Sequence, residues 1–308
     1  MPKRTSLNKR AGKLLNKILP AGIILAVAII AGFGFLVYGL THPGATPETV
    51  NPTHFMLPSL DVSWSSSGGE IDGWLIPGLK GAPGIVLSPG YGMSRSDVLS
   101  LAAALRENGF NVLVYDQRGS GSSPRGSSSL GLREPDDLLA ALDFLQSRPE
   151  VNRDRLGIWG VDVGARAALL AAATRPEVRA VAADSAFGSV VDFVNIRLRQ
   201  KLHMSSAAFE FCSRQFLSLY LLALPSSMHG GIPLESLADR SILFIQGENR
   251  KELAGLTASL YDQLRPQKEM ITLPVARVRL MGAEELKTYD RQVSNFFRLN
   301  LQGVPPSG

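Results

Sequence analysis

A carboxylate side chain lies between two closely spaced glycines in the run Gly160-Val161-Asp162-Val163-Gly164. Small residues two positions before and two positions after a central residue allow a sharp turn from a strand into a helix, with the central side chain exposed. Aspartate is among the few residues besides glycine that tolerate the positive φ angle of such a turn. A carboxylate held there has the chemistry of a nucleophile or of a proton acceptor. Asp162 is therefore the first candidate for a functional residue.

Other motifs lie near the ends of the predicted strands on either side of Asp162. They are DQRGSGSS at 116–123, the spaced residues Gly131, Glu134 and Asp137, RLGIWG at 155–160 and ADSAF at 183–187. With these motifs, residues 60–300 resemble the α/β-hydrolase superfamily, in particular its serine aminopeptidase-like and acyl-transferring enzymes. The matches are to the family's D-x-R-G-x-G-x-S turn, to the G-x-x-E-x-x-D start of the next helix, and to the strands before and after the nucleophile. The resemblance implies an α/β-hydrolase fold with its site at the strand ends.

The resemblance also implies a catalytic triad of serine, acid and histidine, and the sequence departs from it at all three positions. Asp162 stands where the family's G-x-S-x-G turn has its serine. Arg250 stands near the acid position, in a segment where the family has G-x-x-D, and Glu285 stands where G-A-x-H has the histidine. A glutamate is a much weaker base than imidazole, and its charge would be repelled by a neighbouring aspartate. The sequence therefore predicts the loss of ordinary acyl-serine catalysis.

The backbone donors of an oxyanion hole are expected at Tyr91 and Val163. Tyr91 lies in PGYG at 89–92, where the family has H-G-x-G, and Val163 follows the turn. These N–H groups would face the anionic Asp162 unless Arg250 neutralises it. If the strand ends converge, the simplest electrostatic arrangement is a buried cluster of Asp162, Arg250 and Glu285.

Few other side chains offer a base or a metal ligand. Asp184, after the strand that follows Asp162, could occupy an alternative acid position, but an acid without a histidine has nothing to orient. Histidines occur only at His42, His54, His203 and His229. Lone histidines in helices or loops are more often surface or packing residues, and no H-x-H or H-E-x-x-H spacing occurs. With one cysteine, Cys212, the sequence predicts no disulfide, no metal site and no cofactor.

Short β-rich apolar runs alternate with helical ones through the region that carries these residues. Segment 61–78 predicts a hairpin, and further strands are predicted at 84–90, 111–116, 155–160, 178–185, 241–247 and 269–275. Apolar residues recur at helical spacing in 96–109, 135–148, 165–175, 252–264 and 285–301. This alternation predicts an α/β fold with a mostly parallel central sheet and helices on both faces. The interval 188–235 has helical patterns without a clear strand, which indicates an inserted helical lid.

The N-terminal region predicts a membrane anchor. Residues 18–40 contain no charge, and as a helix they are long enough to cross about 30 Å of hydrocarbon. A signal peptide usually has an apolar core of only about 7–15 residues, so an uncleaved anchor is the preferred interpretation. Six cations precede this segment, at Lys3, Arg4, Lys9, Arg10, Lys13 and Lys17. They place the N-terminus in the cytoplasm and the following domain outside it.

Charge and composition complete the domain organisation. Removing those six cations from the 32 basic residues leaves 26 against 27 acidic ones, so the rest of the chain is nearly neutral and nucleic-acid binding is not expected. We expect a basic cytoplasmic tail at 1–17, a transmembrane helix at 18–40 and a linker at 41–54. An α/β-hydrolase domain follows at 55–301, with its lid at about 188–235, and a flexible tail at 302–308.

Three functional hypotheses follow from these expectations. The first is a membrane-anchored, catalytically degenerate hydrolase that binds a small acyl or peptide-like ligand under the lid, or a protein partner. The second is an active hydrolase that uses Asp162 as nucleophile on an ester, epoxide or halide, with Glu285 or a lid histidine, His203 or His229, activating the water. The third is a non-catalytic interaction module of the cell envelope.

Overall fold

The computed structural model describes residues 4–43, 50–123, 126–203, 206–222, 230–264, 268–276 and 278–302. The chain divides into two units, Met1–Leu40 and Thr41–Gly308, which are considered separately. Parts of three predicted segments, the basic tail 1–17, the linker 41–54 and the C-terminal tail 302–308, lie outside the described residues.

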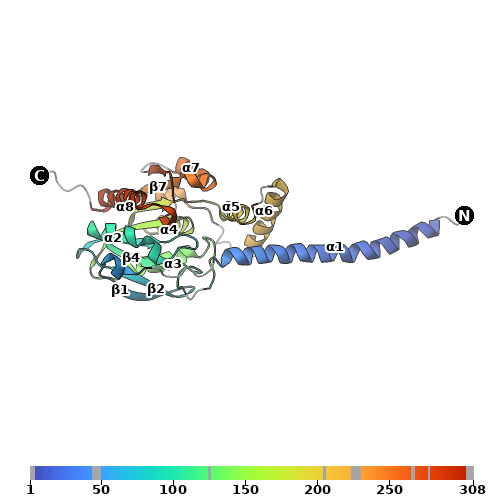
Figure 1. Ribbon diagram of the computed structural model, residues 1–308, viewed down its shortest axis with the longest axis horizontal. Helices are drawn as coiled ribbons and strands as arrows, with labels where there is room; N and C mark the ends of the chain where they lie inside the picture. The colour runs from blue at the N-terminus through green and yellow to red at the C-terminus, as the bar shows by residue number, and fades with distance from the viewer. Residues whose placement is uncertain are drawn as a thin grey trace. The chain divides into compact units, whose positions relative to one another are not determined.

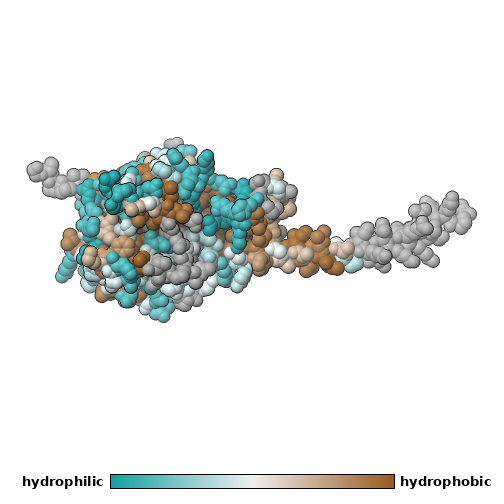
Figure 2. Space-filling model, in the orientation of Figure 1, coloured by the Kyte–Doolittle hydropathy of each residue, from teal (hydrophilic) through white to brown (hydrophobic). Residues whose placement is uncertain are grey.

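Helix α1 (Arg4–Thr41) forms the first unit and ends at the first residue of the second. Its segment Leu19–Thr41 is long and apolar enough to cross a membrane, with a mean hydropathy of 2.6. An apolar surface follows this part of the helix in Figure 2. Length and composition of this kind fit either a membrane span or a signal sequence near the N-terminus.

An eight-stranded sheet forms the centre of the second unit, in the spatial order β1-β2-β4-β3-β5-β6-β7-β8. The strands are β1 (Leu60–Ser66), β2 (Gly69–Ile76), β3 (Ala82–Ser88), β4 (Asn111–Tyr115), β5 (Val151–Val161), β6 (Val178–Asp184), β7 (Ser241–Gly247) and β8 (Lys268–Leu273). Strand β2 is antiparallel to both β1 and β4, and every other neighbouring pair is parallel. The carboxyl ends of β3, β5, β6 and β7 therefore meet at one edge of the sheet.

Helices cover both faces of the sheet (Figure 1). Apolar residues of α2 (Leu99–Glu107) and α8 (Ala283–Phe297) form the core on one face. The other face is packed against α3 (Glu134–Gln146), α4 (Val163–Thr174) and α7 (Lys251–Gln263). The predicted fold class is confirmed, because the alternation of strands and helices requires crossover connections on both faces.

Two helices are inserted between β6 and β7. They are α5 (Val190–Leu202) and α6 (Ala207–Leu222), and they lie within the interval in which the sequence predicts a lid. The buried guanidinium of Arg166 on α4 donates to the carbonyl oxygens of Gly188 at 2.5 Å and of Gly230 at 2.9 Å. One side chain thus holds both ends of the inserted segment against the sheet domain.

Candidate functional site

Asp162 forms the turn between β5 and α4. Its φ angle is 40° and its ψ angle is −100°, a strained conformation for a residue with a side chain. A Cβ atom on Gly160 would lie 2.4 Å from the carbonyl oxygen of Gly164, and one on Gly164 would lie 2.2 Å from that of Ser88. Only glycine fits at these two positions, so the spacing of the run produces the turn.

The carboxylate of Asp162 is buried against two backbone N–H groups. Its Oδ1 atom accepts hydrogen bonds from the nitrogen of Tyr91 at 2.7 Å and from that of Val163 at 2.6 Å. Two converging N–H donors at this distance have the geometry of an oxyanion hole. An oxygen of the protein itself occupies the position that the developing anion of an acyl substrate would take.

The second oxygen of Asp162 faces Arg250, which follows β7 and precedes α7. The Nη2 atom of Arg250 lies 3.4 Å from Oδ2 of Asp162, and its Nη1 atom donates to the hydroxyl of Ser185 at 3.2 Å. Only 12% of the Arg250 side chain and 7% of the Asp162 side chain are exposed, so this ion pair is largely desolvated. The structure therefore brings together two of the three residues of the predicted cluster.

A second carboxylate, Asp184, connects Arg250 to the interior. It is fully buried at the end of β6 and accepts hydrogen bonds from Ser185 Oγ at 2.7 Å and from Tyr289 Oη at 3.0 Å. The indole nitrogen of Trp159 donates in turn to Tyr289 Oη at 2.8 Å. Burial raises the pKa of Asp184 to about 6, against the opposing effects of Ser185, Arg250 and Tyr289. A continuous chain of polar contacts thus runs from Trp159 to Asp162.

Tyr289 is the functional residue that sequence reasoning missed. It lies on α8, four residues after Glu285, and it is completely buried. The hydroxyl donates a hydrogen bond to Asp184, for which the sequence indicated no partner. Burial, followed by the charge of Asp184, raises the pKa of Tyr289 well above its usual value, and the phenol is neutral. Its position on the apolar stripe of the last predicted helix was the available signal.

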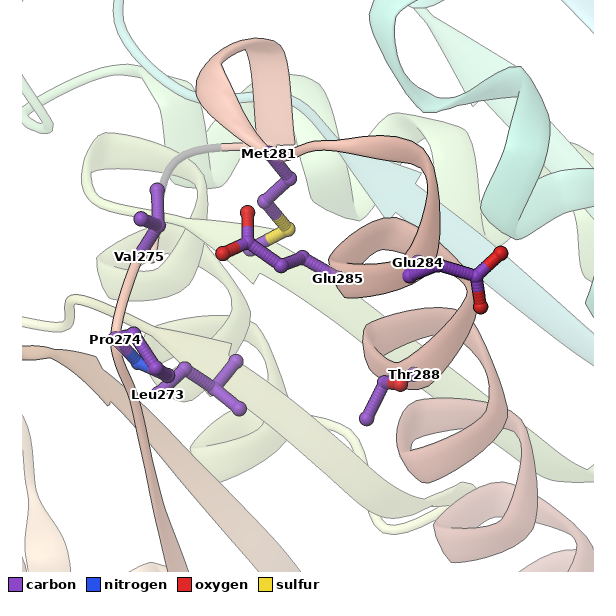
Figure 3. A pocket seen from close by; sticks show the side chains of 7 residues that line it. All are labelled: Leu273, Pro274, Val275, Met281, Glu284, Glu285 and Thr288. Atoms are coloured by element: carbon purple, nitrogen blue, oxygen red, sulfur yellow. The ribbon is translucent and has the colours of Figure 1, made fainter.

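Glu285 does not join the cluster. Its side chain is exposed, and its Oε2 atom accepts a hydrogen bond from the nitrogen of Gly282 at 2.9 Å, which caps the start of α8. Figure 3 shows it over a cavity of about 250 Å³ lined mainly by Leu273, Pro274, Val275 and Met281. The predicted buried cluster of three residues is thus corrected to a pair, because the helix N-terminus engages the glutamate.

Helix α5 packs on the loop that carries Tyr91. The ring of Phe193 meets that of Tyr91 edge to face at 6.4 Å, and Phe193 stacks on Phe187 at 4.3 Å. The guanidinium of Arg197 lies 4.5 Å from the centre of the Tyr91 ring. Burial raises the pKa of Tyr91, and Arg197 opposes that effect. The inserted segment thus covers one of the two donor residues.

No histidine contacts the Asp162 carboxylate in the described part of the chain, where its hydrogen bonds come from Tyr91, Val163 and Arg250. His42 shares a hydrogen bond with Thr41, and His54 contacts Asn51 at the start of a short helix. His203 is exposed at the end of α5. His229 lies outside the described residues.

Metal ligands do not gather at this site. Among the described residues, no group of three or more His, Cys, Asp or Glu side chains is arranged to hold a metal ion. Cys212 is free and exposed on α6.

Comparison with known proteins gives the same architecture. A family model described as alpha/beta hydrolase fold matches residues 83–226. The chain is 27% identical to the polyketide transferase grgF of a Penicillium species, over 76% of this chain and 84% of that protein. It is 33% identical to the thiohydrolase apmlB of Arthrinium phaeospermum over 38% of this chain and 39% of that protein.

Solved structures extend the similarity to the whole sheet domain. The Pyrococcus furiosus esterase Pf2001 superposes with a TM-score of 0.65 at 20% identity, over 85% of this chain and 98% of the esterase. The α/β hydrolase GrgF from Penicillium gives a TM-score of 0.58 at 20% identity, over 80% of this chain and all of that one. At these identities the likeness establishes the fold.

Proposed function

The chain belongs to the α/β-hydrolase superfamily, and we propose that within it this protein is a membrane-anchored, catalytically degenerate member. In this proposal it binds a small acyl or peptide-like ligand, or a protein partner, and does not hydrolyse it. The observation that carries the proposal is the position of Asp162 Oδ1 between the nitrogens of Tyr91 and Val163.

An occupied donor pair argues against acyl transfer. In a serine hydrolase the nucleophile attacks while a separate substrate oxygen develops charge in the oxyanion hole. Here a carboxylate oxygen fills that position. A substrate oxygen could enter only if Asp162 gave up both hydrogen bonds. The developing substrate anion would then lie next to the carboxylate of Asp162, and the two negative charges would repel each other.

Among the described residues, none that contacts the Asp162 side chain can act as a base. Arg250 lies at its second oxygen, and a guanidinium cannot accept a proton. Glu285 is engaged in helix capping. Loss of the nucleophile or of the histidine in a serine hydrolase costs a factor of about 10⁶ in turnover, so simultaneous replacement of all triad positions supports a binding role.

The names of similar proteins support an acyl ligand. Polyketide transferases and thiohydrolases act on acyl groups by name, and the structural neighbours include an esterase. The covering contact of α5 on Tyr91 supports a ligand held beneath the inserted segment.

The apolar segment Leu19–Thr41 supports anchoring, with its six preceding cations supporting a cytoplasmic N-terminus. Fractionation with alkaline carbonate, together with N-terminal sequencing of the mature protein, tests this part. Retention in the membrane with an intact N-terminus is expected. A soluble protein that begins after residue 41 would contradict the anchor and identify the segment as a signal sequence.

One observation favours the alternative in which Asp162 is a nucleophile. Two N–H donors fix Oδ1, which also fixes the direction of Oδ2, the oxygen that would attack a carbon atom. Attack on a halide would form an ester and release the halide ion, attack on an epoxide would open the ring to a hydroxy ester, and attack on an ester would form an anhydride and release the alcohol. Water would then have to be activated to hydrolyse the intermediate. Arg250 stands at Oδ2, and no base is in contact with Asp162 in the part of the chain that the structure describes.

A turnover assay separates these proposals. The full chain, in a neutral detergent, is incubated with short and medium-chain esters, thioesters and aminoacyl amides. Three proteins are compared: the unaltered chain, Asp162→Ala, and Asp154→Ala, which removes an exposed carboxylate from β5. We expect no turnover above buffer from any of them. Turnover that Asp162→Ala abolishes and Asp154→Ala keeps would contradict the degenerate assignment.

A further inference from the structure

Helices α2 and α8 lie on the face of the sheet opposite α3, α4 and α7 (Figure 1). A groove lined largely by polar residues lies between these two helices. Its volume is about 580 Å³, and residues of both helices line it at spacings of three and four. The small side chains of Ala103 and Ala104 leave the space between the two helices. The groove contains no residue of the site around Asp162.

Two buried polar atoms in the residues that line this groove have no partner. They are Oδ1 of Asp290 and Oγ of Ser294, on residues that are 5% and 3% exposed. The other oxygen of Asp290 accepts a hydrogen bond from Ser100 on α2. Native proteins pair nearly all of their buried polar atoms, so two unpartnered atoms one helical turn apart leave hydrogen-bonding capacity that a bound group in the groove can use. Burial also raises the pKa of Asp290 to about 6.

The rim of the groove is positively charged. Lys287, Arg291 and Arg298 line it from the α8 side, and Glu107 lines it from α2. Lys287 pairs with Glu284 at 2.9 Å, and Arg298 donates to Asn295 at 2.8 Å. Arg291 is exposed and has no carboxylate partner among the described residues. The rim therefore favours an anionic group, and guanidinium groups bind phosphate with two parallel hydrogen bonds.

We propose that the groove between α2 and α8 binds a phosphorylated polyol. A hydroxyl group both donates and accepts, so adjacent hydroxyls of one ligand supply a donor to Asp290 and a partner to Ser294. The phosphate lies at the rim against Arg291 and Arg298. Both unpartnered atoms are covered in the free protein, so binding includes a rotation of these side chains toward the groove. The ligand is either a soluble phosphate ester or the headgroup of a lipid, which share this chemistry.

Thermal unfolding of the full chain in neutral detergent tests the proposal with defined probes. They are myo-inositol 1-phosphate, phosphatidylinositol dispersed in the same micelles, myo-inositol and inorganic phosphate. We expect one of the two phosphorylated compounds to raise Tm more than either fragment does. A rise with the soluble compound assigns a free phosphate ester, and a rise with the lipid alone assigns a headgroup. The proposal would be overturned if inorganic phosphate raised Tm as much as the phosphorylated compounds do, or if no probe changed Tm.

Two variants place the effect in the groove. Ser294→Ala removes an unpartnered hydroxyl, so it should raise Tm of the ligand-free protein and abolish most of the ligand-induced rise. Arg291→Ala should weaken binding about tenfold by calorimetry. Arg153→Ala, which removes an exposed cation from β5, is the matched control and should leave binding unchanged. A lower ligand-free Tm in Ser294→Ala, or equal binding losses in the two arginine variants, would contradict the assignment.

Discussion

The Oδ1 atom of Asp162 lies 2.7 Å from the backbone nitrogen of Tyr91, a residue 71 positions earlier in the chain. This contact joins the turn after β5 to the loop after β3, and Val163 supplies a second donor to the same oxygen. With Arg250 at Oδ2, both oxygens of the carboxylate are engaged. The polar groups around this turn thus bind one another, and the stability of the protein should depend on them.

Asp162 and Arg250 should be energetically coupled. Asp162→Ala leaves two N–H donors without an acceptor and removes the carboxylate partner of the largely buried Arg250, so we expect a loss of about 3–5 kcal/mol in the free energy of unfolding. Arg250→Met should be less costly, and the double variant should be more stable than the sum of the two losses indicates. Equilibrium denaturation of the four proteins in neutral detergent measures the coupling. Additive losses would show that the ion pair contributes nothing.

The stability should rise as the pH falls from 7 to 5. Burial raises the folded-state pKa of Asp184, and that of Asp290, to about 6, above the ordinary value of 3.8. Between these values the folded protein binds more protons than the unfolded one, so acidification favours folding. Asp184→Asn should reduce this dependence and Asp184→Asn with Asp290→Asn should remove most of it. Tm measured at pH 5, 6 and 7 checks both. A slope unchanged in Asp184→Asn would refute the assignment.

Tyr289→Phe should destabilise the protein by about 1–3 kcal/mol, because it leaves the indole of Trp159 and one oxygen of Asp184 without their partner. The hydroxyl of Tyr289 also lowers the pKa of Asp184, so the midpoint of the pH dependence should move upward. Tyr261→Phe is the control, since that hydroxyl has no hydrogen-bond partner among the described residues. Equal effects of the two substitutions on the pH profile would contradict a connected chain.

Arg166→Met should loosen the segment that carries α5 and α6. The guanidinium is bonded to carbonyl oxygens at both ends of that segment, and burial lowers the pKa of Arg166 to about 10 without removing its charge at neutral pH. We expect faster tryptic cleavage within 190–222 at temperatures well below unfolding. Arg179→Met, an exposed position on β6, provides the comparison. Unchanged cleavage in Arg166→Met would show that the ends are held by other contacts.

The sequence was sufficient to predict the turn at Asp162 and the sheet, because both depend on local rules. Gly160 and Gly164 indicate the turn because only residues without a side chain fit at these positions. The strands and helices are indicated by the periodicity of their apolar residues. The meeting of Asp162 and Arg250 followed from parallel strands that end at one edge. These features required no knowledge of side-chain direction.

Glu285 and Tyr289 show where this reasoning stopped. Both lie near the start of α8, but only Tyr289, one turn after Glu285, is buried against the sheet. The spacing from Gly282 to Glu285 is that of an N-cap and its third helical residue, a local signal that competes with any role in the core. The hydrogen-bond donor of Asp184 could not be predicted from the sequence either, because it comes from Tyr289, 105 positions away.

In our proposal, Asp162 is a buried structural carboxylate and not a nucleophile. To test this proposal, the full chain is incubated with esters, thioesters, epoxides and alkyl halides in heavy-oxygen water. The peptide that contains Asp162 is then analysed by mass spectrometry. If Asp162 attacked a substrate, it would form an ester with an epoxide or alkyl halide and an anhydride with an ester or thioester. Water that attacked the Asp162 carboxyl carbon of either intermediate would leave a heavy oxygen in the side chain. We predict that the mass of the peptide containing Asp162 is unchanged, with no adduct on it, and that no product forms from any substrate. A heavy oxygen or a covalent adduct on Asp162 would contradict the account.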